Sequence, residues 1–228
     1  MELTKVIITA MKEEADLIIK KFDLKEVKKL KNISIYEWNR DSNWEKEKIV
    51  LALSWIWKIQ SSIATTYLFE NYEIDKLVNI GIAWSLNNMD VKVWDVYLPN
   101  TFIQHDMYLP FEGEHLDYAK KPIFLNYAIW ENIDLNKFGL VLNWVCATWD
   151  EFVDNEDRIN DLNNSFAADV CEMEAFSVLS VAREYDALDK CVVIKAVSDW
   201  ADNDAKEDHM NNLDFAMENS IWVLEIVL

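Results

Sequence analysis

Acidic residues follow several apolar, strand-like runs in this sequence. Glu14 comes shortly after the run LTKVIITA, and Asp199 comes directly after the run CVVIKAVS. Glu172 and Glu174 stand just before an apolar, helix-like segment. Carboxyl groups can serve as general acid and general base when their surroundings hold one protonated and the other ionised. Glu14, Glu174 and Asp199 are therefore the candidates for catalysis, with Glu172 beside them.

Each of these positions also has a structural interpretation. Glu14 and Glu174 fall where a helix is expected to begin, and an acid there is stabilised by the helix dipole. Asp199 could cap a helix N-terminus with its side chain. The residue types alone leave both interpretations open.

The elements that would position these residues alternate along the chain. Apolar runs predict strands at 3–10, 33–38, 48–54, 77–81, 139–146 and 191–197, with one or two more within 91–104. Helical spacing predicts helices at 12–22, 58–72, 173–185 and 212–227. This pattern predicts one α/β domain over residues 1–228, a three-layer sandwich with a central mixed, mostly parallel sheet. Ligands bind such sheets beyond the carboxyl ends of the strands.

Composition excludes several classes of protein. The 228 residues carry a formal net charge of −19, which repels phosphate groups and argues against nucleic acid or an anionic membrane as partner. The sequence begins without a cationic leader, and no apolar run reaches the roughly 18 residues of a membrane span. The three cysteines form no CxxC pair, as expected of reduced thiols. We therefore expect a cytoplasmic protein.

The glycine and tryptophan counts are abnormal. The chain has 3 glycines and 11 tryptophans, whereas average usage of about 7% would give roughly 16 glycines. Three glycines are too few for the positive-φ turns of an α/β domain of this size. Several tryptophans stand where such a turn is expected, just after a strand.

Short motifs follow the predicted strands in a fixed order. They are AMKEE at 10–14, SWIWK at 54–58, GIAW at 81–84, VWD at 93–95, HD at 105–106, WDEF at 149–152, EMEA at 172–175 and SDWAD at 198–202. Taken together, over essentially the whole chain, they resemble the methylthioadenosine/S-adenosylhomocysteine nucleosidases, within the purine nucleoside phosphorylase superfamily. That family has glycine at five of these positions, here Trp55, Trp57, Trp84, Trp94 and Trp149.

Real tryptophans at these positions would strain the backbone and fill a ligand pocket, at roughly 1–3 kcal/mol per site. Our interpretation is that UGA codons read as glycine in the source have been translated as tryptophan. Trp38, Trp44 and Trp144 also occupy turn-like positions where we expect glycine. The alternative is a genuinely diverged protein with a filled pocket.

The resemblance implies a nucleoside phosphorylase-like fold and hydrolysis of the N-glycosidic bond of methylthioadenosine and S-adenosylhomocysteine, or of a related adenine nucleoside. By the same resemblance, Asp199 protonates adenine at N7 while Ser198 helps to orient it. Glu14 activates the attacking water, and Glu174 accepts hydrogen bonds from the ribose hydroxyls.

The resemblance implies further contacts with the substrate. Phe152 stacks on adenine, the Val153 backbone reads the edge of the base, and Ile56 lines the thioalkyl side. Met173, Ala83 and Glu172 complete the implied substrate site. The family is usually homodimeric, so Met107 and Pro110, in the segment 105–113, are expected to close the neighbouring subunit's pocket. It needs no metal and no organic cofactor, and the three scattered histidines agree with this.

Two alternatives stay open. A phosphate-dependent purine nucleoside phosphorylase would hold phosphate with arginines, but the three arginines, Arg40, Arg158 and Arg183, lie outside the relevant turns. If the tryptophans are genuine, a non-catalytic nucleoside-binding protein becomes the alternative. The sequence does not rank methylthioadenosine, S-adenosylhomocysteine, deoxyadenosine and aminodeoxyfutalosine as substrates.

Overall fold

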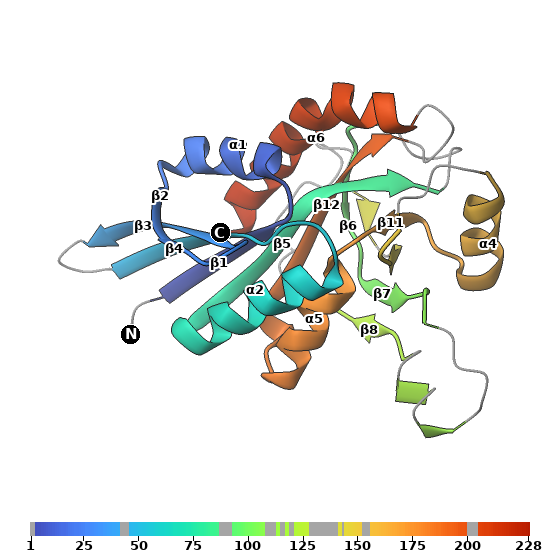
Figure 1. Cartoon of the computed structure of the whole chain (residues 1–228), viewed down its shortest axis with the longest axis horizontal. Coiled ribbons are helices and arrows are strands. Elements are labelled where there is room, and N and C mark those ends of the chain that lie inside the picture. The colour runs from blue at the N-terminus through green and yellow to red at the C-terminus, as the bar shows by residue number, and fades with distance from the viewer. Residues whose placement is uncertain are drawn as a thin grey trace.

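The computed structural model describes residues 3–41, 46–86, 93–107, 113–114, 117–118, 121–127, 141–142, 144–151, 156–199 and 205–228. A central sheet lies between two layers of helices (Figure 1). The strands are β1 (Leu3–Thr9), β2 (Lys25–Lys29), β3 (Ser34–Asp41), β4 (Lys46–Leu53), β5 (Ile74–Ser85), β6 (Val96–Leu98), β7 (Thr101–Gln104), β8 (Ile123–Phe124), β9 (Val141–Leu142), β10 (Val145–Thr148), β11 (Val170–Glu172) and β12 (Cys191–Asp199). The helices are α1 (Lys12–Phe22), α2 (Lys58–Asn71), α4 (Glu156–Phe166), α5 (Ala175–Glu184) and α6 (Ala205–Val227), with a 3-10 turn η3 (Leu188–Lys190).

The sheet is mixed, and its main path runs β2-β3-β4-β1-β5-β11-β10-β7-β8. Parallel pairs join β1 to β4 and β5, β12 to β5, β10 to β7 and β11, and β6 to β9. Antiparallel pairs join β2 to β3, β3 to β4, β5 to β11, β6 to β12 and β7 to β8. The predicted α/β sandwich with a mixed central sheet is therefore confirmed.

Strand β5 lies at the centre of the molecule and pairs with β1, β12 and β11. Its residues from Leu77 to Ser85 are all buried, as expected of a strand covered on both faces. The prediction of a short strand at 77–81 was too short at both ends. Polar Asp75 and Lys76 masked its start, and Trp84 was assigned to a turn.

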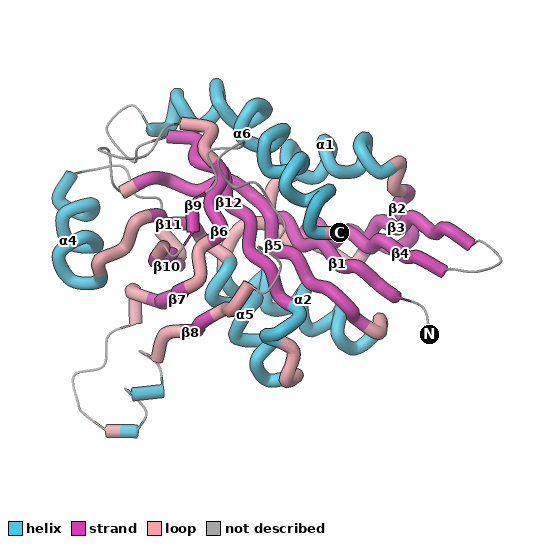
Figure 2. The backbone as a smooth tube through the Cα atoms, turned by 180° about the vertical axis from the view of Figure 1, so that it is seen from behind, coloured by secondary structure: helices cyan, strands magenta, loops and turns pink. Residues whose placement is uncertain are grey.

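Helices cover both faces of the sheet (Figures 1 and 2). On one face α1 and α6 pack over β4, β5 and β12, where Ile7, Ile18 and Leu224 are buried in one hydrophobic cluster. On the other face α2 and α5 pack against each other, and Leu68 and Leu179 join a second cluster. No helix in the described ranges is both long and apolar enough to cross a bilayer.

Five elements were missing from the sequence-based prediction: β2, β8, β11, α4 and η3. For three of them the physical reason is visible in the sequence. Strand β2 reads KEVKK and is exposed along its whole length, so it carries no apolar signal. Strand β11 is only three residues long, and α4 has few apolar residues. Trp38 was expected at a turn, which is wrong, because it lies inside β3 opposite Ile49. Trp44 lies outside the described residues.

Candidate active site

A cavity of about 130 Å³ lies at the carboxyl ends of β1 and β11, beside the C-terminal part of β5. Residues that follow or end these strands line it, together with the start of α1 and the loop before α2. The lining residues are Ala10, Met11, Glu14, Ile56, Ile82, Trp84, Glu172, Met173 and Glu174. Three carboxylates predicted to belong to the site therefore line one cavity.

Glu14 is held at this cavity by backbone and side-chain donors. Its Oε2 accepts hydrogen bonds from Thr9 Oγ1 at 2.6 Å, Ala10 N at 3.1 Å and Met11 N at 2.9 Å. Its Oε1 accepts one from Ile82 N at 3.1 Å. The bond from Met11 caps α1, so the structural interpretation of Glu14 is also correct. Because a carboxylate oxygen has two lone pairs, Oε1 keeps one for a further donor such as water.

Gly81 explains how Glu14 comes so close to β5. A Cβ atom built at Gly81 would lie 2.8 Å from Glu14 Oε1, closer than side chains tolerate. Any larger residue would push the Glu14 carboxylate away from Ile82 N. Glycine here therefore lets the Glu14 carboxylate keep its bond to Ile82 N.

Glu174 is the N-cap residue of α5 and is buried. Its Oε1 accepts a hydrogen bond from the Trp57 backbone N at 3.2 Å, which links it to the loop before α2. Burial, and after it the negative charge of Glu172, raises the pKa of Glu174 to about 8. This carboxyl group therefore titrates near neutral pH.

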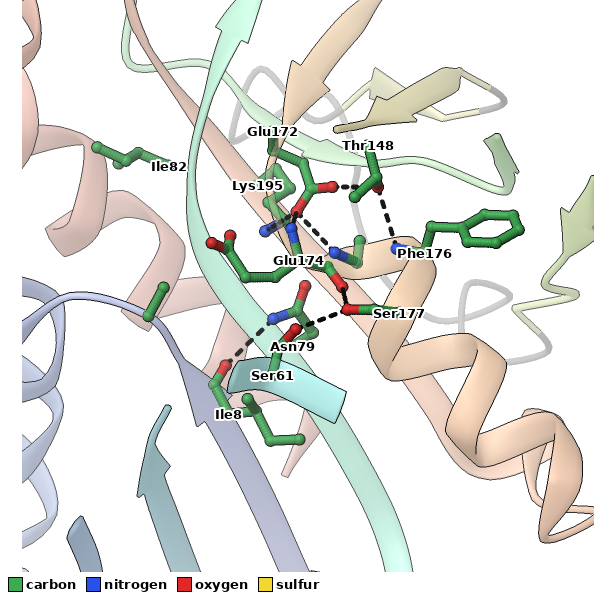
Figure 3. A network of polar contacts seen from close by, with 12 residues as sticks. Ile8, Ser61, Asn79, Ile82, Thr148, Glu172, Glu174, Phe176, Ser177 and Lys195 are labelled. Carbon is green, nitrogen blue, oxygen red and sulfur yellow. Dashed lines mark hydrogen bonds and ion pairs between the residues drawn. The ribbon is translucent and has the colours of Figure 1, made fainter. Parts of the chain in front are cut away.

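Behind Glu174 lies a buried polar network (Figure 3). Glu172 Oε2 accepts hydrogen bonds from Glu174 N at 2.9 Å and Ala175 N at 2.8 Å, and lies 2.8 Å from Lys195 Nζ. Glu172 Oε1 accepts one from the Thr148 hydroxyl. These contacts turn both carboxylate oxygens of Glu172 toward the protein interior.

Asp199 is the last residue of β12, and its backbone pairs with Trp84 of β5. A register shift separates this pair from Val197 and Ala83, so the end of β12 departs from regular pairing. Ser198 is fully buried. The side chain of Asp199 lies outside the described part of the structure, but its backbone is beside a residue that lines the cavity.

Of the remaining predicted site residues, four lie within the described residues and three do not. Ile56 and Met173 line the cavity, and Ala83 is buried next to Trp84. Met107 is exposed and is not among the residues that line the cavity. Three predicted residues lie outside the described residues: Phe152, Val153 and Pro110.

Three of the five tryptophans at family glycine positions have glycine-like backbone angles. Trp55 has φ 68°, Trp57 has φ 88° and Trp94 has φ 79°. With ψ 150°, Trp57 falls in a region that is essentially restricted to glycine. All three indoles are about half exposed, so little packing offsets this strain. The backbone at these positions therefore supports glycine as the residue that fits.

Trp84 and Trp149 differ from these three because their φ angles are not positive and their side chains are buried. Trp84 lies within β5 and forms part of the cavity wall. Pockets for small organic ligands usually measure about 300–1,000 Å³. The cavity of about 130 Å³ is smaller than this range, as expected when an indole replaces glycine.

Replacing Trp57 with glycine is expected to raise the free energy of unfolding by about 1 kcal/mol. Relief of a strained φ is worth about 1–3 kcal/mol and outweighs the entropic cost of glycine, about 0.5–1 kcal/mol. Trp94→Gly should act in the same direction. Trp144→Gly is the control that should destabilise, because Trp144 has no positive φ, contrary to the glycine expected there, and packs against Tyr97 with ring centroids 4.8 Å apart. Urea unfolding measures all three, and a loss of stability in Trp57→Gly would contradict the account.

Glu174 is expected to lower stability as the pH rises. Between the ordinary glutamate pKa of about 4.3 and about 8, the folded chain keeps a proton that the unfolded chain has lost. The contribution of Glu174 is therefore fully favourable below this window and is lost through it. The stability gained in Glu174→Gln should grow from about pH 4 to about pH 8. Exposed Glu184→Gln, also on α5, should show no such trend in thermal unfolding.

Sequence reasoning missed the residues that support the carboxylates. Lys195 stands inside the apolar run CVVIKAV, where a charged residue is a visible anomaly that was not used. Lys58, the first residue of α2, donates to Asp106 at 2.5 Å and lies 3.6 Å from Asp150, which joins the start of α2 to the segments that follow β7 and β10. No group of His, Cys, Asp and Glu within the described ranges is arranged to hold a metal ion.

Comparison with known proteins agrees with this geometry. A family model described as the Phosphorylase superfamily matches residues 4–228. Aminodeoxyfutalosine nucleosidase of Helicobacter pylori (strain ATCC 700392 / 26695) is 27% identical over 87% of this chain and 86% of its own length. The 5'-methylthioadenosine/S-adenosylhomocysteine nucleosidase of Buchnera aphidicola subsp. Schizaphis graminum is 26% identical over 97% of this chain and 94% of its own length.

A futalosine hydrolase mutant of Helicobacter pylori has the same fold, with a TM-score of 0.85 and 25% identity. The match covers 99% of this chain and 98% of that chain. These relatives are nucleosidases, so the resemblance read from the sequence motifs is confirmed. Because this family model matches nearly the whole length of the chain, the chain belongs to the phosphorylase superfamily.

Proposed function

We propose that this protein hydrolyses the N-glycosidic bond of an adenine nucleoside and releases adenine. The observation that carries the proposal is the convergence of Glu14 and Glu174 on one cavity at the carboxyl ends of the strands. The two residues come from different ends of the chain and are both buried. In a chain of this superfamily, such a pair supports binding of a ribose by one carboxylate and activation of water by the other.

The reaction needs a proton for the leaving base and a water for the ribose. In the proposal, Asp199 donates a proton to N7, so that adenine leaves as a neutral base, and Ser198 orients Asp199. Glu14 accepts a proton from water through the lone pair that remains on Oε1, and the resulting oxygen nucleophile attacks the anomeric carbon. The bond from Ile82 N fixes the orientation of that carboxylate.

The other contacts would hold the nucleoside. Glu174 accepts hydrogen bonds from the ribose hydroxyls, and Met173 packs beside the sugar. Phe152 stacks on adenine, while the Val153 backbone recognises its edge. Ile56 lines the thioalkyl side.

Water is favoured over phosphate as the attacking group by the charge of the cavity. Three carboxylates belong to the described wall, Glu14, Glu172 and Glu174, and no arginine or lysine does. The described wall therefore offers no cation to bind a phosphate dianion, because the nearby Lys195 ammonium group is already paired with Glu172. Arg40 and Arg183 lie in β3 and α5, outside the described lining.

A phosphate titration tests this choice. Adenine release from methylthioadenosine is expected to proceed in phosphate-free buffer, with free methylthioribose as the second product. Added phosphate should leave the rate unchanged and form no sugar phosphate. A rate that rises with phosphate, together with formation of a sugar 1-phosphate, would identify a phosphorylase.

The names of the relatives suggest the nucleosides to compare. They are methylthioadenosine, S-adenosylhomocysteine and aminodeoxyfutalosine. In the proposal the protein is a homodimer in which Met107 and Pro110 close the thioalkyl side of the neighbour's pocket. The exposure of Met107 supports such a role.

A second candidate function applies if tryptophan at position 84 is genuine. The indole of Trp84 on the cavity wall and the small cavity volume favour a protein without turnover that binds part of a nucleoside. Binding of an adenine nucleoside analogue without release of adenine would support this alternative.

A further inference from the structure

The buried lysine of β12 is not explained by the proposed reaction. Lys195 is 1% exposed and lies in the middle of the strand, opposite Gly81 of β5 and Tyr97 of β6. Its Nζ is 2.8 Å from Glu172 Oε2. A buried ion pair is costly to desolvate and is often replaceable by apolar residues without loss of stability. Its presence directly behind the cavity wall therefore calls for a functional explanation.

Glu172 connects this lysine to the N-terminus of α5. Its Oε2 receives the backbone N–H groups of Glu174 and Ala175 as well as the Lys195 ammonium group. The Thr148 hydroxyl donates to its other oxygen and accepts from Phe176 N at 3.0 Å. Three successive backbone N–H groups at the start of α5 are thus satisfied by this network (Figure 3).

The same network determines the surroundings of Glu174, the residue proposed to hold the ribose. Glu174 is the N-cap of α5, so its backbone position depends on the bond from its own N–H to Glu172. Two buried carboxylates next to each other repel, and Lys195 is the positive charge that offsets them. Burial alone would lower the pKa of Lys195, but the charges of Glu172 and Glu174 raise it above its ordinary value, so it stays protonated.

We propose that Lys195 is a positioning residue of the site, which acts through Glu172 to fix the start of α5 and to offset the charge beside Glu174. In this arrangement Glu172 does not contact substrate with its carboxylate but anchors its neighbour. The inference rests on the proposed function, because the purpose of the anchor is to present Glu174 to the ribose hydroxyls.

The test compares the pH profile of kcat/KM in four variants, each made in the form of the chain, with tryptophan or with glycine at the five positions, that releases adenine. Lys195→Met removes the positive charge, so the Glu172–Glu174 pair should keep its proton to higher pH and the rising limb of the profile should move to higher pH. KM at neutral pH should rise about tenfold or more, with a smaller change in kcat. Lys195→Arg should keep most of the activity, and the rising limb of its profile should stay at the original pH.

The double variant Glu172→Gln/Lys195→Met separates electrostatics from folding. It removes both members of the ion pair, so Glu172 is not left charged without its partner, and it should fold even where Lys195→Met does not. Glu172 raises the pKa of Glu174 more than Lys195 lowers it. Removal of both should therefore lower this pKa and move the rising limb of the profile to lower pH. Shifts of opposite sign are not expected of a lysine that only stabilises the fold. Lys76→Met, which removes a partly buried lysine bonded to Val227 O, is the matched control and should leave the profile unchanged.

Unchanged profiles in Lys195→Met and the double variant, with wild-type KM, would overturn the inference while leaving the nucleosidase proposal intact. If no form releases adenine from any nucleoside, the proposed function fails first. The influence of Lys195 on Glu174 is then tested by unfolding experiments. Lys195→Met should steepen the loss of stability with rising pH, and Glu174→Gln should abolish this difference. An equal loss of stability in both backgrounds would overturn the inference.

Discussion

Replacing Asp199 with asparagine is expected to lower the rate of adenine release by about 10²–10⁴-fold, the usual contribution of a general acid. Asparagine keeps the shape of the side chain but has no proton to donate to N7. Glu14→Gln should produce a loss of similar size, because an amide cannot take a proton from water. Binding of a nucleoside analogue should be affected much less than turnover in both variants.

A control for this prediction comes from the other end of the same strand. Asp189 lies in η3, immediately before β12, and is exposed. Asp189→Asn changes the net charge by the same amount and should leave the rate unchanged. Near-full activity in Asp199→Asn or Glu14→Gln, with normal thermal unfolding, would remove that residue from the mechanism.

Replacing Trp84 with glycine is expected to give the second large effect, a gain in affinity for adenine nucleosides of at least about tenfold. The indole occupies the wall of a cavity that is too small for a nucleoside, and its removal enlarges that cavity. Calorimetric titration with a non-hydrolysable adenosine analogue measures the change. Trp222→Ala on α6, a half-buried tryptophan outside the described cavity wall, is the control and should leave affinity unchanged.

The opposite outcome has a clear meaning. If Trp84 is a native core residue, its removal should cost about 3–5 kcal/mol of stability and create no binding.

The coding DNA provides an independent check at Trp55, Trp57, Trp84 and Trp149. UGA at all four positions, in a genome that decodes UGA as glycine, would make glycine the true residue. UGG at any of them would make that tryptophan genuine.

Much of the site could be predicted because its residues are tied to strand ends. Glu14 follows β1, and Glu172 and Glu174 surround the junction of β11 and α5, so short motifs fixed their positions within the fold. A strand end is visible in sequence because the buried run stops there. The same logic located Asp199 at the end of β12.

What could not be predicted depends on contacts between distant segments. The hydrogen bond from Trp57 N to Glu174 joins residues far apart in the chain, and no local sequence pattern predicts it. The role of Gly81 was also invisible, because it follows from the distance to Glu14 and not from a turn. Lys195 gave a signal, a charge in a buried strand, but only the fold reveals Glu172 as its partner.

Turn positions were predicted unevenly. Trp55, Trp57 and Trp94 were expected at turns and have positive φ. The turns could be predicted at these positions because the neighbouring residues indicate them. Trp84 was also assigned to a turn, yet β5 continues through it, because pairing with β11 and β12 extends the strand. Tertiary pairing thus overrode the local signal at that position.

The most direct test of the central claim is adenine release from methylthioadenosine by the form that carries glycine at positions 55, 57, 84, 94 and 149. We expect release in phosphate-free buffer, at a rate that falls by about 10²–10⁴-fold when Asp199→Asn is added to the same form. Absence of adenine release from a folded sample, or release that persists in the Asp199→Asn form, would contradict this claim.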